Sequence, residues 1–428
     1  MKKYLPRLVD EYIKNVLKDF TAVHIRGPKW CGKTSTSEFL CKSSIKLNNK
    51  AQKSYFEQMY AVDPSLFLEG DKPRLIDEWQ VFPYIWDEIK NYADETHLKN
   101  QFILTGSYSP KQGTTIHTGS MRIVRVDMTT MSLFESGDSS GIYSLSDLFC
   151  NPNKEISGVS SKNRFDITNM IIRGGWPEAI VNPPHNLSIY GQQALRSICD
   201  LDIQEASGQN LSPITTEYIL RSISRNLSQE VSNTTIIKDV VNSGHNLSEQ
   251  TFYDYYNALL RLFVINEIPA WSPNIRSKTS IRSLPKKEIF DPSLACAALK
   301  IDSEALNKDF KTRGFFFECL VARDLKVYAN TFNGNISYYR DRLGLECDFV
   351  IHKNDLEYCL IECKCGEGHI DEGANNLNKM TKLINEYNKN NINNHIQLPL
   401  FKMIITDGQY AYRRTDGIIV MPISLLKN

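Results

Sequence analysis

The pattern of apolar and polar positions in the first part of the chain predicts strands that alternate with helices. Residues 22–25 form a strand-like run before a helix-like run, and later apolar runs lead to Asp77 and to Thr105. Residues 122–128 read as a fifth strand. Short apolar runs of this kind are typical of buried strands. We therefore expect an α/β domain with a parallel sheet at residues 1–165.

The middle of the chain shows a mostly helical pattern that begins after a polar stretch. Residues 130–165 are rich in serine, glycine and asparagine, so we expect a loop or linker there. From residue 166 the pattern is helical until the sequence RGGWPE interrupts it. We interpret this interruption as a fixed turn packed by Trp176; recognition through Arg173 and Trp176 is the alternative.

The next segment has the order of elements of a winged helix. A short helix at residues 235–241 precedes a second helix, which begins at a capping signal near Glu249, and a strand at residues 263–268. In such a domain the second helix can read DNA. Here that helix is acidic and aromatic, with Arg261 as its lone basic residue, so a lid or packing module is favoured. We expect a helical and winged-helix domain at residues 166–290. Four later basic residues could still contact phosphates: Lys278, Arg282, Lys286 and Lys287.

The C-terminal part contains a strand with an acid and a base on one face. In the sequence YCLIECKCG, Glu362 and Lys364 share a face because side chains alternate along a strand. Asp348 lies on a preceding strand that reads as the antiparallel neighbour, which would bring the three residues together. Glu318 lies on an otherwise apolar helical stripe, where a carboxylate is costly unless it is paired or metal-bound. The alternative for Glu362 and Lys364 is an ion pair on a solvated edge strand. We expect a C-terminal α/β domain at residues 291–428.

Composition narrows the class of protein. The 428 residues suggest two or three domains, and 41% hydrophobic and 23% charged residues are ordinary for a soluble globular chain. The net charge of +1 means that any surface for nucleic acid is local. The start of the chain lacks an export signal, and no apolar run is long enough to span a bilayer. We therefore expect a cytoplasmic protein that does not enter a membrane.

The ten cysteines are expected to be free and mostly buried thiols, as in a reducing compartment. A zinc site is the alternative, because four cysteines lie close together in the C-terminal part. Their spacing matches no common zinc-binding pair arrangement, so buried thiols are favoured. These four residues are Cys347, Cys359, Cys363 and Cys365.

A phosphate-binding motif follows the first predicted strand. The sequence GPKWCGKT fits G-x-x-x-x-G-K-[ST] between a strand and a helix. Its backbone N–H groups and the positive end of the helix would hold phosphates. Lys33 would reach the β- and γ-phosphates as a catalytic residue, and Thr34 would bind Mg²⁺. The expected nucleotide-binding residues are Gly27, Pro28, Lys29, Trp30, Cys31, Gly32, Lys33, Thr34 and Ser35, with Asp77 and Thr105.

The sequence PRLIDEWQ supplies a second half for this site. Asp77 at a strand end would bind Mg²⁺ with Thr34, and Glu78 would orient or deprotonate the attacking water. A hydroxyl of Thr105 or Ser107 could sense the γ-phosphate. A surface loop with two acids is the alternative. We find no guanine-reading N-K-x-D motif, so ATP is favoured over GTP as the cofactor.

These motifs resemble a family of prokaryotic predicted AAA-type P-loop ATPases. The resemblance is carried by YLPRLVDEYI, GPKWCGKTST, RLIDEWQVFP, FILTGSYSP and MSLFESG, and it continues through IIRGGWPEA and YYRDRLGLECDFVI. In that family a C-terminal domain of unknown function follows the P-loop module. The resemblance therefore implies an AAA-type ATPase over nearly the whole chain.

The acids of the C-terminal part are similar to those of the PD-(D/E)XK, or restriction-endonuclease-like, superfamily. The resemblance implies that Glu318, Asp348 and Glu362 bind Mg²⁺ and that Lys364 helps to generate hydroxide for attack on a phosphodiester. Asp348, Glu362 and Lys364 are then catalytic. Hard oxygen ligands suit Mg²⁺, and the metal lowers the pKa of bound water. The alternative is a degenerate domain of this type, which has a binding or structural role and no nuclease activity.

Two functions remain open from the sequence. The first is an Mg²⁺-dependent ATPase coupled to a nuclease-like domain that acts on or senses DNA or RNA. The alternative is a regulatory ATPase switch whose C-terminal domain binds a partner protein and cuts nothing. Arg122 or Arg125 could stabilise the transition state across a subunit contact, which makes a homo-oligomer a further expectation.

Overall fold

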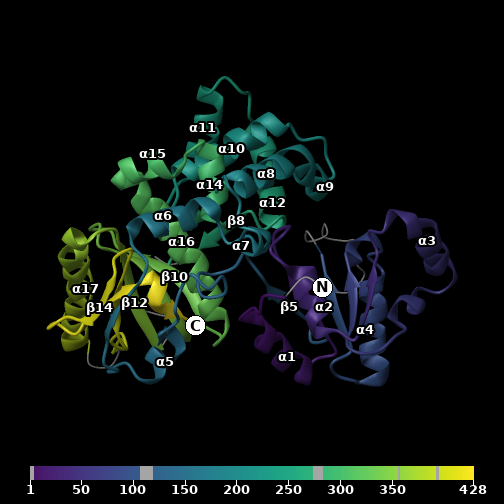
Figure 1. Cartoon of the computed structure of the whole chain (residues 1–428), viewed down its shortest axis with the longest axis horizontal. Coiled ribbons are helices and arrows are strands. Elements are labelled where there is room, and N and C mark those ends of the chain that lie inside the picture. The colour runs from purple at the N-terminus through teal and green to yellow at the C-terminus, as the bar shows by residue number, and fades with distance from the viewer. Residues whose placement is uncertain (1–3, 107–118, 273–282, 355–356, 392–394) are drawn as a thin grey trace. The chain divides into compact units, whose positions relative to one another are not determined.

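The computed structural model divides the chain into two compact units (Figure 1). The first unit consists of Met1–Thr130, Asp202–Asn210 and Tyr255–Val264, and the second consists of Met131–Leu201, Leu211–Asp254 and Ile265–Asn428. The structure describes residues 4–106, 119–272, 283–354, 357–391 and 395–428. The expected domain boundaries at residues 165 and 290 stay a prediction.

The first unit is built on the parallel sheet that the sequence predicts. Its strands lie in the order β2-β3-β4-β1-β5, and every neighbouring pair is parallel. The strands are β1 (Ala22–Arg26), β2 (Ser43–Lys46), β3 (Arg74–Asp77), β4 (Phe102–Thr105) and β5 (Ile123–Asp127). The helices are α1 (Val9–Asp19), α2 (Lys33–Leu40), α3 (Lys53–Val62), α4 (Ile85–Thr96) and α9 (Ile203–Ser207), and the end of α12 (Glu249–Arg261) also belongs here. Single 3-10 turns are η1 (Lys50–Gln52), η2 (Pro64–Leu68) and η3 (Trp79–Val81).

Apolar side chains on both faces of these strands require cover on both sides. Val23 of β1 packs in one cluster with Ile13 of α1, and Ala22 packs in another with Trp86 of α4. Successive side chains of a strand point to opposite faces, so helices on both sides bury the sheet. Parallel strands end at a common edge, and the carboxyl ends of β1, β3 and β4 therefore meet there.

The second unit contains a mixed seven-stranded sheet. The order is β10-β11-β12-β13-β15-β14-β7, with antiparallel pairs from β10 to β12 and parallel pairs from β12 through β13 to β15. The strands are β7 (Ser157–Val159), β10 (Asn335–Arg340), β11 (Glu346–Asn354), β12 (Glu357–Lys364), β13 (Lys402–Thr406), β14 (Tyr410–Arg413) and β15 (Ile419–Pro422). Two further pairs are β6 (Tyr143–Ser144) with β16 (Leu426–Lys427), and β8 (Ile265–Ile268) with β9 (Lys286–Ile289).

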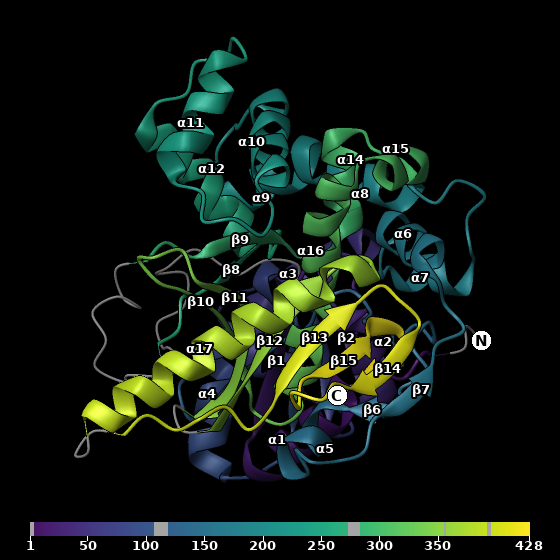
Figure 2. The same ribbon diagram turned by 90° about the vertical axis from the view of Figure 1, so that its left-hand side faces the viewer.

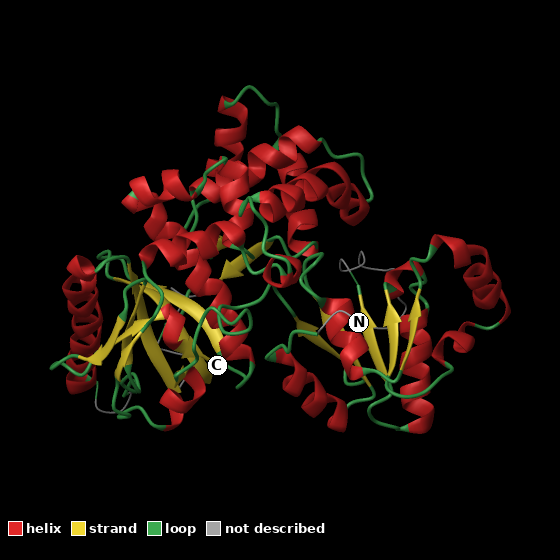
Figure 3. Cartoon of the chain, in the orientation of Figure 1, coloured by secondary structure: helices red, strands yellow, loops and turns green. Residues whose placement is uncertain are grey.

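Helices make up most of the second unit before this sheet (Figure 3). They are α5 (Leu145–Cys150), α6 (Arg164–Arg173), α7 (Pro177–Val181), α8 (Ile189–Ser197), α10 (Pro213–Arg225), α11 (Asn233–Asn242), α14 (Pro292–Leu299), α15 (Ser303–Lys308), α16 (Phe310–Asn330) and α17 (Ile370–Asn390). Shorter turns are the π-helical η4 (Ile198–Asp202), and η5 (Glu367–His369) and η6 (Ile423–Leu425). The last long helix, α17, lies across the strands of the sheet (Figure 2), and its Leu377 and Met380 pack with Val350 and Leu360. Among the helices of the described residues, none has the length and apolar character needed to cross a membrane.

The expectation of a loop or linker at residues 130–165 holds for most of the segment and is wrong for three short elements. This segment contains β6, α5 and β7, and β7 pairs with β14 at the edge of the large sheet. Leu145, Leu148 and Phe149 of α5 are buried. Elements this short give too few apolar positions to show a period in the sequence, so only their tertiary contacts reveal them.

The elements expected for the winged helix are present. Helices α11 and α12 and strand β8 follow one another, and Ser248 Oγ accepts a hydrogen bond from the N–H of Thr251 at 3.1 Å, which caps the second helix. Lys278 and Arg282 lie outside the described residues. The identification of this region as a winged helix stays a prediction.

The sequence RGGWPE forms a buried turn, as expected. Trp176 is buried and its Nε1 donates a hydrogen bond to Ser293 Oγ at 2.9 Å. A Cβ at Gly175 would lie 2.1 Å from the carbonyl oxygen of Met131, so only glycine fits. The backbones at Gly175 and Met131 therefore lie too close together for any side chain at position 175.

Candidate functional site

The phosphate-binding loop connects β1 to α2 in the first unit. Gly27 has a φ of +152°, and a Cβ there would lie 2.0 Å from the carbonyl oxygen of Met128. Gly32, with a φ of +104°, directly precedes the first residue of α2. The loop thus needs glycine at both motif positions, and it ends at the positive end of a helix, where backbone N–H groups favour phosphate.

Lys33 is buried inside the loop. Its Nζ donates hydrogen bonds to the carbonyl oxygens of Gly27 and Pro28, each at 2.8 Å. The ammonium group is therefore held against the loop that would surround a polyphosphate. To reach a phosphate, Lys33 would exchange two neutral acceptors for an anionic one, which makes a stronger hydrogen bond.

Asp77, Thr34 and Thr105 come together at the carboxyl edge of the sheet. Thr34 Oγ1 donates to Asp77 Oδ1 at 3.1 Å, and Thr105 Oγ1 donates to the same carboxylate. Burial raises the pKa of Asp77, while the bonds from Thr105 and Thr34 oppose the rise. The carboxylate has hydroxyl partners but lacks a full compensating charge, and a divalent cation would supply it.

Glu78 follows Asp77 in a left-handed conformation, with a φ of +58°. Its carboxylate accepts a hydrogen bond from Gln80 Nε2. A non-glycine residue in this region of φ is uncommon, and such residues cluster at functional sites. The backbone therefore leaves the extended conformation of β3 at Glu78.

Sequence reasoning missed the partners of Lys29. Its Nζ lies 2.6 Å from Asp202 Oδ1 and 3.1 Å from Glu205 Oε2, in the part of the first unit that contains α9. Burial disfavours the charge of Lys29, but Asp202 and Glu205 outweigh it and raise its pKa. These acids lie far along the chain in a segment without any motif, so no sequence signal could have identified them.

The other loop residues have varied surroundings. Trp30 is exposed with a φ of +61°, and Ser35 is exposed on α2. The carbonyl oxygen of Cys31 accepts a hydrogen bond from Arg7 Nη1 at 2.8 Å, which anchors the loop. Arg122 forms an ion pair with Asp94 at 2.6 Å. Ser107 lies outside the described residues.

The acids of the second unit surround a lysine. Lys286 Nζ of β9 lies 2.9 Å from Glu318 Oε1, 2.9 Å from Glu346 Oε1 and 3.9 Å from Asp348 Oδ1. Burial disfavours its charge, but the three acids outweigh burial and raise its pKa well above the ordinary value. The buried carboxylate on α16 is therefore paired, and Lys286 does not reach solvent as a phosphate contact would.

Glu362 and Lys364 form a second pair on β12. Glu362 Oε2 lies 3.0 Å from Lys364 Nζ. Burial and the nearby Asp348 raise the pKa of Glu362 to about 8, whereas Lys364 opposes the rise. Asp348 Oδ2 accepts a hydrogen bond from the N–H of Cys363 at 2.7 Å. The strand pairing brings the expected residues into one region, as predicted.

Metal ligation in this region gains no support from the geometry. In the described part of the chain, no group of three or more His, Cys, Asp or Glu residues is arranged to hold a metal ion. All ten cysteines lie in the described residues and are free thiols. Glu318, Asp348 and Glu362 as metal ligands, and Lys364 as a catalytic base, stay predictions.

Comparisons with known proteins give three family matches. Residues 19–136 match an AAA domain, residues 164–305 match a domain of unknown function (DUF8612) and residues 313–426 match another (DUF4143). A search of curated proteins finds no match.

Two solved structures are similar to the chain. A Walker-type ATPase of Pyrococcus abyssi is 14% identical with a TM-score of 0.41, over 70% of this chain and 96% of that chain. A signal transduction ATPase with numerous domains and a tetratricopeptide repeat sensor, from Pyrococcus horikoshii, is 12% identical with a TM-score of 0.25, over 78% of this chain and 48% of that chain. Both TM-scores are below 0.5, so neither similarity supports a conclusion about this chain.

The AAA match covers the loop at Gly27, the pair Asp77–Glu78 and the strand that ends at Thr105. The match at the C-terminal end is to a domain of unknown function, so the restriction-endonuclease-like fold stays a prediction. The motif, the parallel sheet that presents it and the family match agree: this chain is a P-loop ATPase with an AAA domain at residues 19–136.

Proposed function

We propose that the chain binds ATP with Mg²⁺ and hydrolyses it at the carboxyl edge of the parallel sheet. The observation that carries this proposal is the contact of Thr34 Oγ1 with the buried carboxylate of Asp77 at 3.1 Å. A hydroxyl and a carboxylate side by side are hard oxygen ligands that suit Mg²⁺. Bound Mg²⁺ would offset the charge that develops on the phosphates.

The side chains of the chain itself have separate tasks in this proposal. Lys33 moves from the carbonyl oxygens of the loop to the β- and γ-phosphates. Thr105 holds Asp77 in one orientation, and Glu78 orients the attacking water or takes its proton. The expectation of ATP rather than GTP rests on the lack of an N-K-x-D motif in the sequence.

Substitution of Lys33 tests the first part of the proposal. Lys33→Ala and Asp77→Asn should each lower ATP turnover by about 100-fold or more, because each removes a charge needed in the transition state. Phosphate release measures turnover, and circular dichroism checks folding. Lys18→Ala, which changes an exposed lysine on α1, is the matched control and should leave turnover unchanged. A folded Lys33→Ala variant with unchanged turnover would refute the proposal.

For the second unit we propose a regulatory module that binds a partner protein and does not cut nucleic acid. The contacts of Lys286 support this choice. Its ammonium group lies 2.9 Å from Glu318 and 3.9 Å from Asp348, two of the three acids predicted to bind Mg²⁺ in a nuclease. The acids that would hold Mg²⁺ already have a cation, and displacing it would leave a buried ammonium group without partners.

A cleavage assay separates this module from a nuclease. The full chain is incubated with Mg²⁺ or Mn²⁺ and with single- or double-stranded DNA or RNA, with and without ATP. We expect no cleavage. Cleavage that is lost in both Asp348→Ala and Lys364→Ala would overturn the proposal and establish the nuclease-like prediction. Cleavage that survives both changes would indicate a contaminant.

A homo-oligomer that completes the ATP site stays a prediction. Light scattering coupled to gel filtration, with and without ATP and Mg²⁺, gives the mass directly. A monomer under all conditions would exclude an arginine supplied by a second copy.

A further inference from the structure

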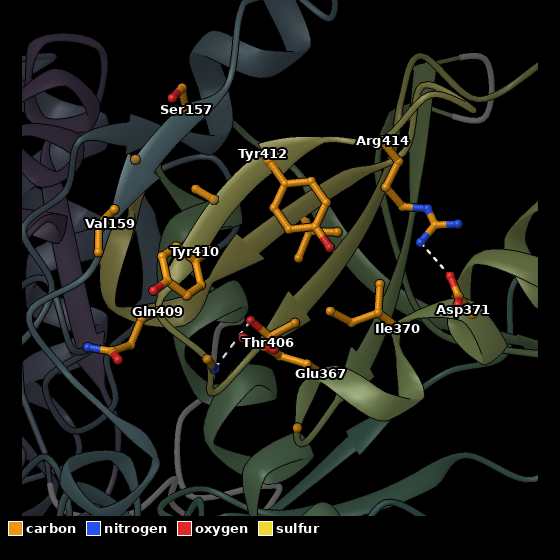
Figure 4. A pocket seen from close by; sticks show the side chains of 15 residues that line it. Ser157, Val159, Glu367, Ile370, Asp371, Thr406, Gln409, Tyr410, Tyr412 and Arg414 are labelled. Atoms are coloured by element: carbon orange, nitrogen blue, oxygen red, sulfur yellow. Dashed lines mark hydrogen bonds and ion pairs between the residues drawn. The ribbon is translucent and has the colours of Figure 1, made fainter.

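A pocket of about 600 Å³ lies at the edge of the large sheet of the second unit (Figure 4). It is formed by β14, the edge strand β7 and the start of α17, and we call it the edge pocket. Its chemistry is set by five side chains, which are Tyr410, Tyr412, Arg414, Glu367 and Asp371. The pocket is separate from the acids around Lys286, because none of those residues lines it.

Two tyrosines give the edge pocket an aromatic wall. Tyr410 and Tyr412 lie on the same face of β14, since side chains alternate along a strand. They are 56% and 38% exposed, which is unusual for two neighbouring aromatic rings. Buried Val420 and Ile370 also line the pocket. The rings therefore offer faces to a ligand above an apolar floor.

The charges around the pocket favour a cation. Arg414 Nη1 lies 2.7 Å from Asp371 (Figure 4). Arg414 Nε lies 3.3 Å from Asp416, so this arginine is already neutralised. Glu367 is exposed, and among the residues that the structure describes no cation pairs with it. The rim is thus acidic overall. Phosphate groups would be repelled, whereas a lysine or arginine side chain can lie on aromatic faces and pair with a carboxylate.

The edge strand itself offers little to an added strand. Tyr143 Oη accepts a hydrogen bond from the N–H of Ser157 and donates one to its carbonyl oxygen, each at 2.8 Å. The hydroxyl group therefore occupies the outward backbone groups at this residue, and continuous strand pairing is blocked there. A partner would engage the edge pocket through a side chain.

We propose that the edge pocket binds a basic segment of a partner protein, with a lysine or arginine side chain against Tyr410 and Tyr412 and its charge near Glu367. The inference deepens the proposed partner-binding role of the second unit and rests on it. Partner contact through one cation on exposed rings is weak, so a natural partner would combine it with further contacts.

Fluorescence anisotropy of the full chain tests this site with a defined probe. The probe is a fluorescein-labelled Gly-Arg-Gly-Lys-Gly-Arg-Gly peptide, and the same peptide with Glu at the basic positions is the charge control. Tyr412→Ala and Glu367→Gln should each weaken binding about five-fold, which corresponds to loss of one cation contact. Tyr412→Phe keeps the ring and should bind like the unchanged protein.

Two control variants distinguish the pocket from the general surface. Tyr253→Ala removes a tyrosine of equal 38% exposure, and Glu386→Gln removes an exposed acid of α17 away from the pocket. Both should bind the basic peptide normally. Equal binding by Tyr412→Ala, Glu367→Gln and the unchanged protein would overturn the inference.

The other outcomes are also decisive. The acidic peptide and a labelled oligo-dT strand are tested in the same assay. If either binds more tightly than the basic peptide, and Tyr412→Ala removes the binding of the oligo-dT strand, the pocket takes an anionic ligand and the basic partner is refuted. ATP turnover and nuclease activity are measured on the same samples. Failure of the peptide assay with turnover intact and no cleavage would refute this inference and leave the proposed function standing.

Discussion

Replacing Lys286 with methionine tests whether this lysine supplies the cation for the acids of the second unit. Lys286 Nζ lies 2.9 Å from Glu318 and 2.9 Å from Glu346, and its side chain is 1% exposed. At an effective dielectric constant of about 20, each such pair has a gross attraction of about 6 kcal/mol. Desolvation offsets much of this, yet removing one partner leaves buried charge uncompensated and costs about 3–5 kcal/mol. We expect Lys286→Met to destabilise the second unit by that amount near neutral pH.

The loss should grow as the pH rises. Burial raises the pKa of Glu318 and of Asp348, and Lys286 opposes both shifts. Without Lys286 both pKa values rise further. At a pH above the ordinary carboxyl pKa, the unfolded variant has therefore lost the protons of these two acids, whereas the folded variant still binds them. Stability then falls with increasing pH, because the folded state binds more protons. The cost should be smaller at about pH 5.5 than at about pH 8.

Hydrogen exchange in increasing urea measures this effect locally, because two compact units need not unfold together. Peptides from α16 and β11 report on the second unit. Lys300→Met is the matched control: this lysine is 75% exposed and 3.8 Å from Glu217, so a change within about 0.5 kcal/mol is expected. The double variant Lys286→Met with Glu318→Gln should recover part of the loss. A loss below about 1 kcal/mol that does not depend on pH would refute the reasoning.

Two further predictions concern the loop at Lys29 and the turn at Gly175. Asp202→Asn should lower the KM for ATP about five-fold, because an ion pair of about 1 kcal/mol no longer restrains Lys29. Glu205→Gln changes an exposed acid and should alter the KM less. An unchanged KM in both variants would mean that Lys29 is not restrained. Gly175→Ala should destabilise the second unit by about 3 kcal/mol, since its Cβ would lie 2.1 Å from a backbone oxygen. The matched change Gly314→Ala in α16, where a Cβ meets no atom within 4 Å, should stabilise by about 0.5–1 kcal/mol. Urea midpoints give both values, and equal effects would contradict the steric argument.

The sequence by itself predicted which residues meet at the proposed ATP site. Two of its features are local: the spacing from Gly27 to Thr34, and the acid at the end of a short apolar run. They could be predicted because the sequence preferences of a turn, a helix start and a strand end extend over only a few residues. Parallel strands then bring their ends to one edge, so the meeting of Asp77 with Thr34 and Thr105 followed from the fold class. The strand alternation near Glu362 was predictable for the same reason.

Tertiary structure decided what those patterns left open. The partner of Glu318 is Lys286 on another element, which the sequence suggested as a phosphate contact. The partner of Lys29 is Asp202, and the edge strand β7 comes from a segment that reads as a linker. Each is a contact between residues far apart along the chain. Local propensity does not specify such contacts, because they depend on how whole elements pack and on which charges that packing removes from water.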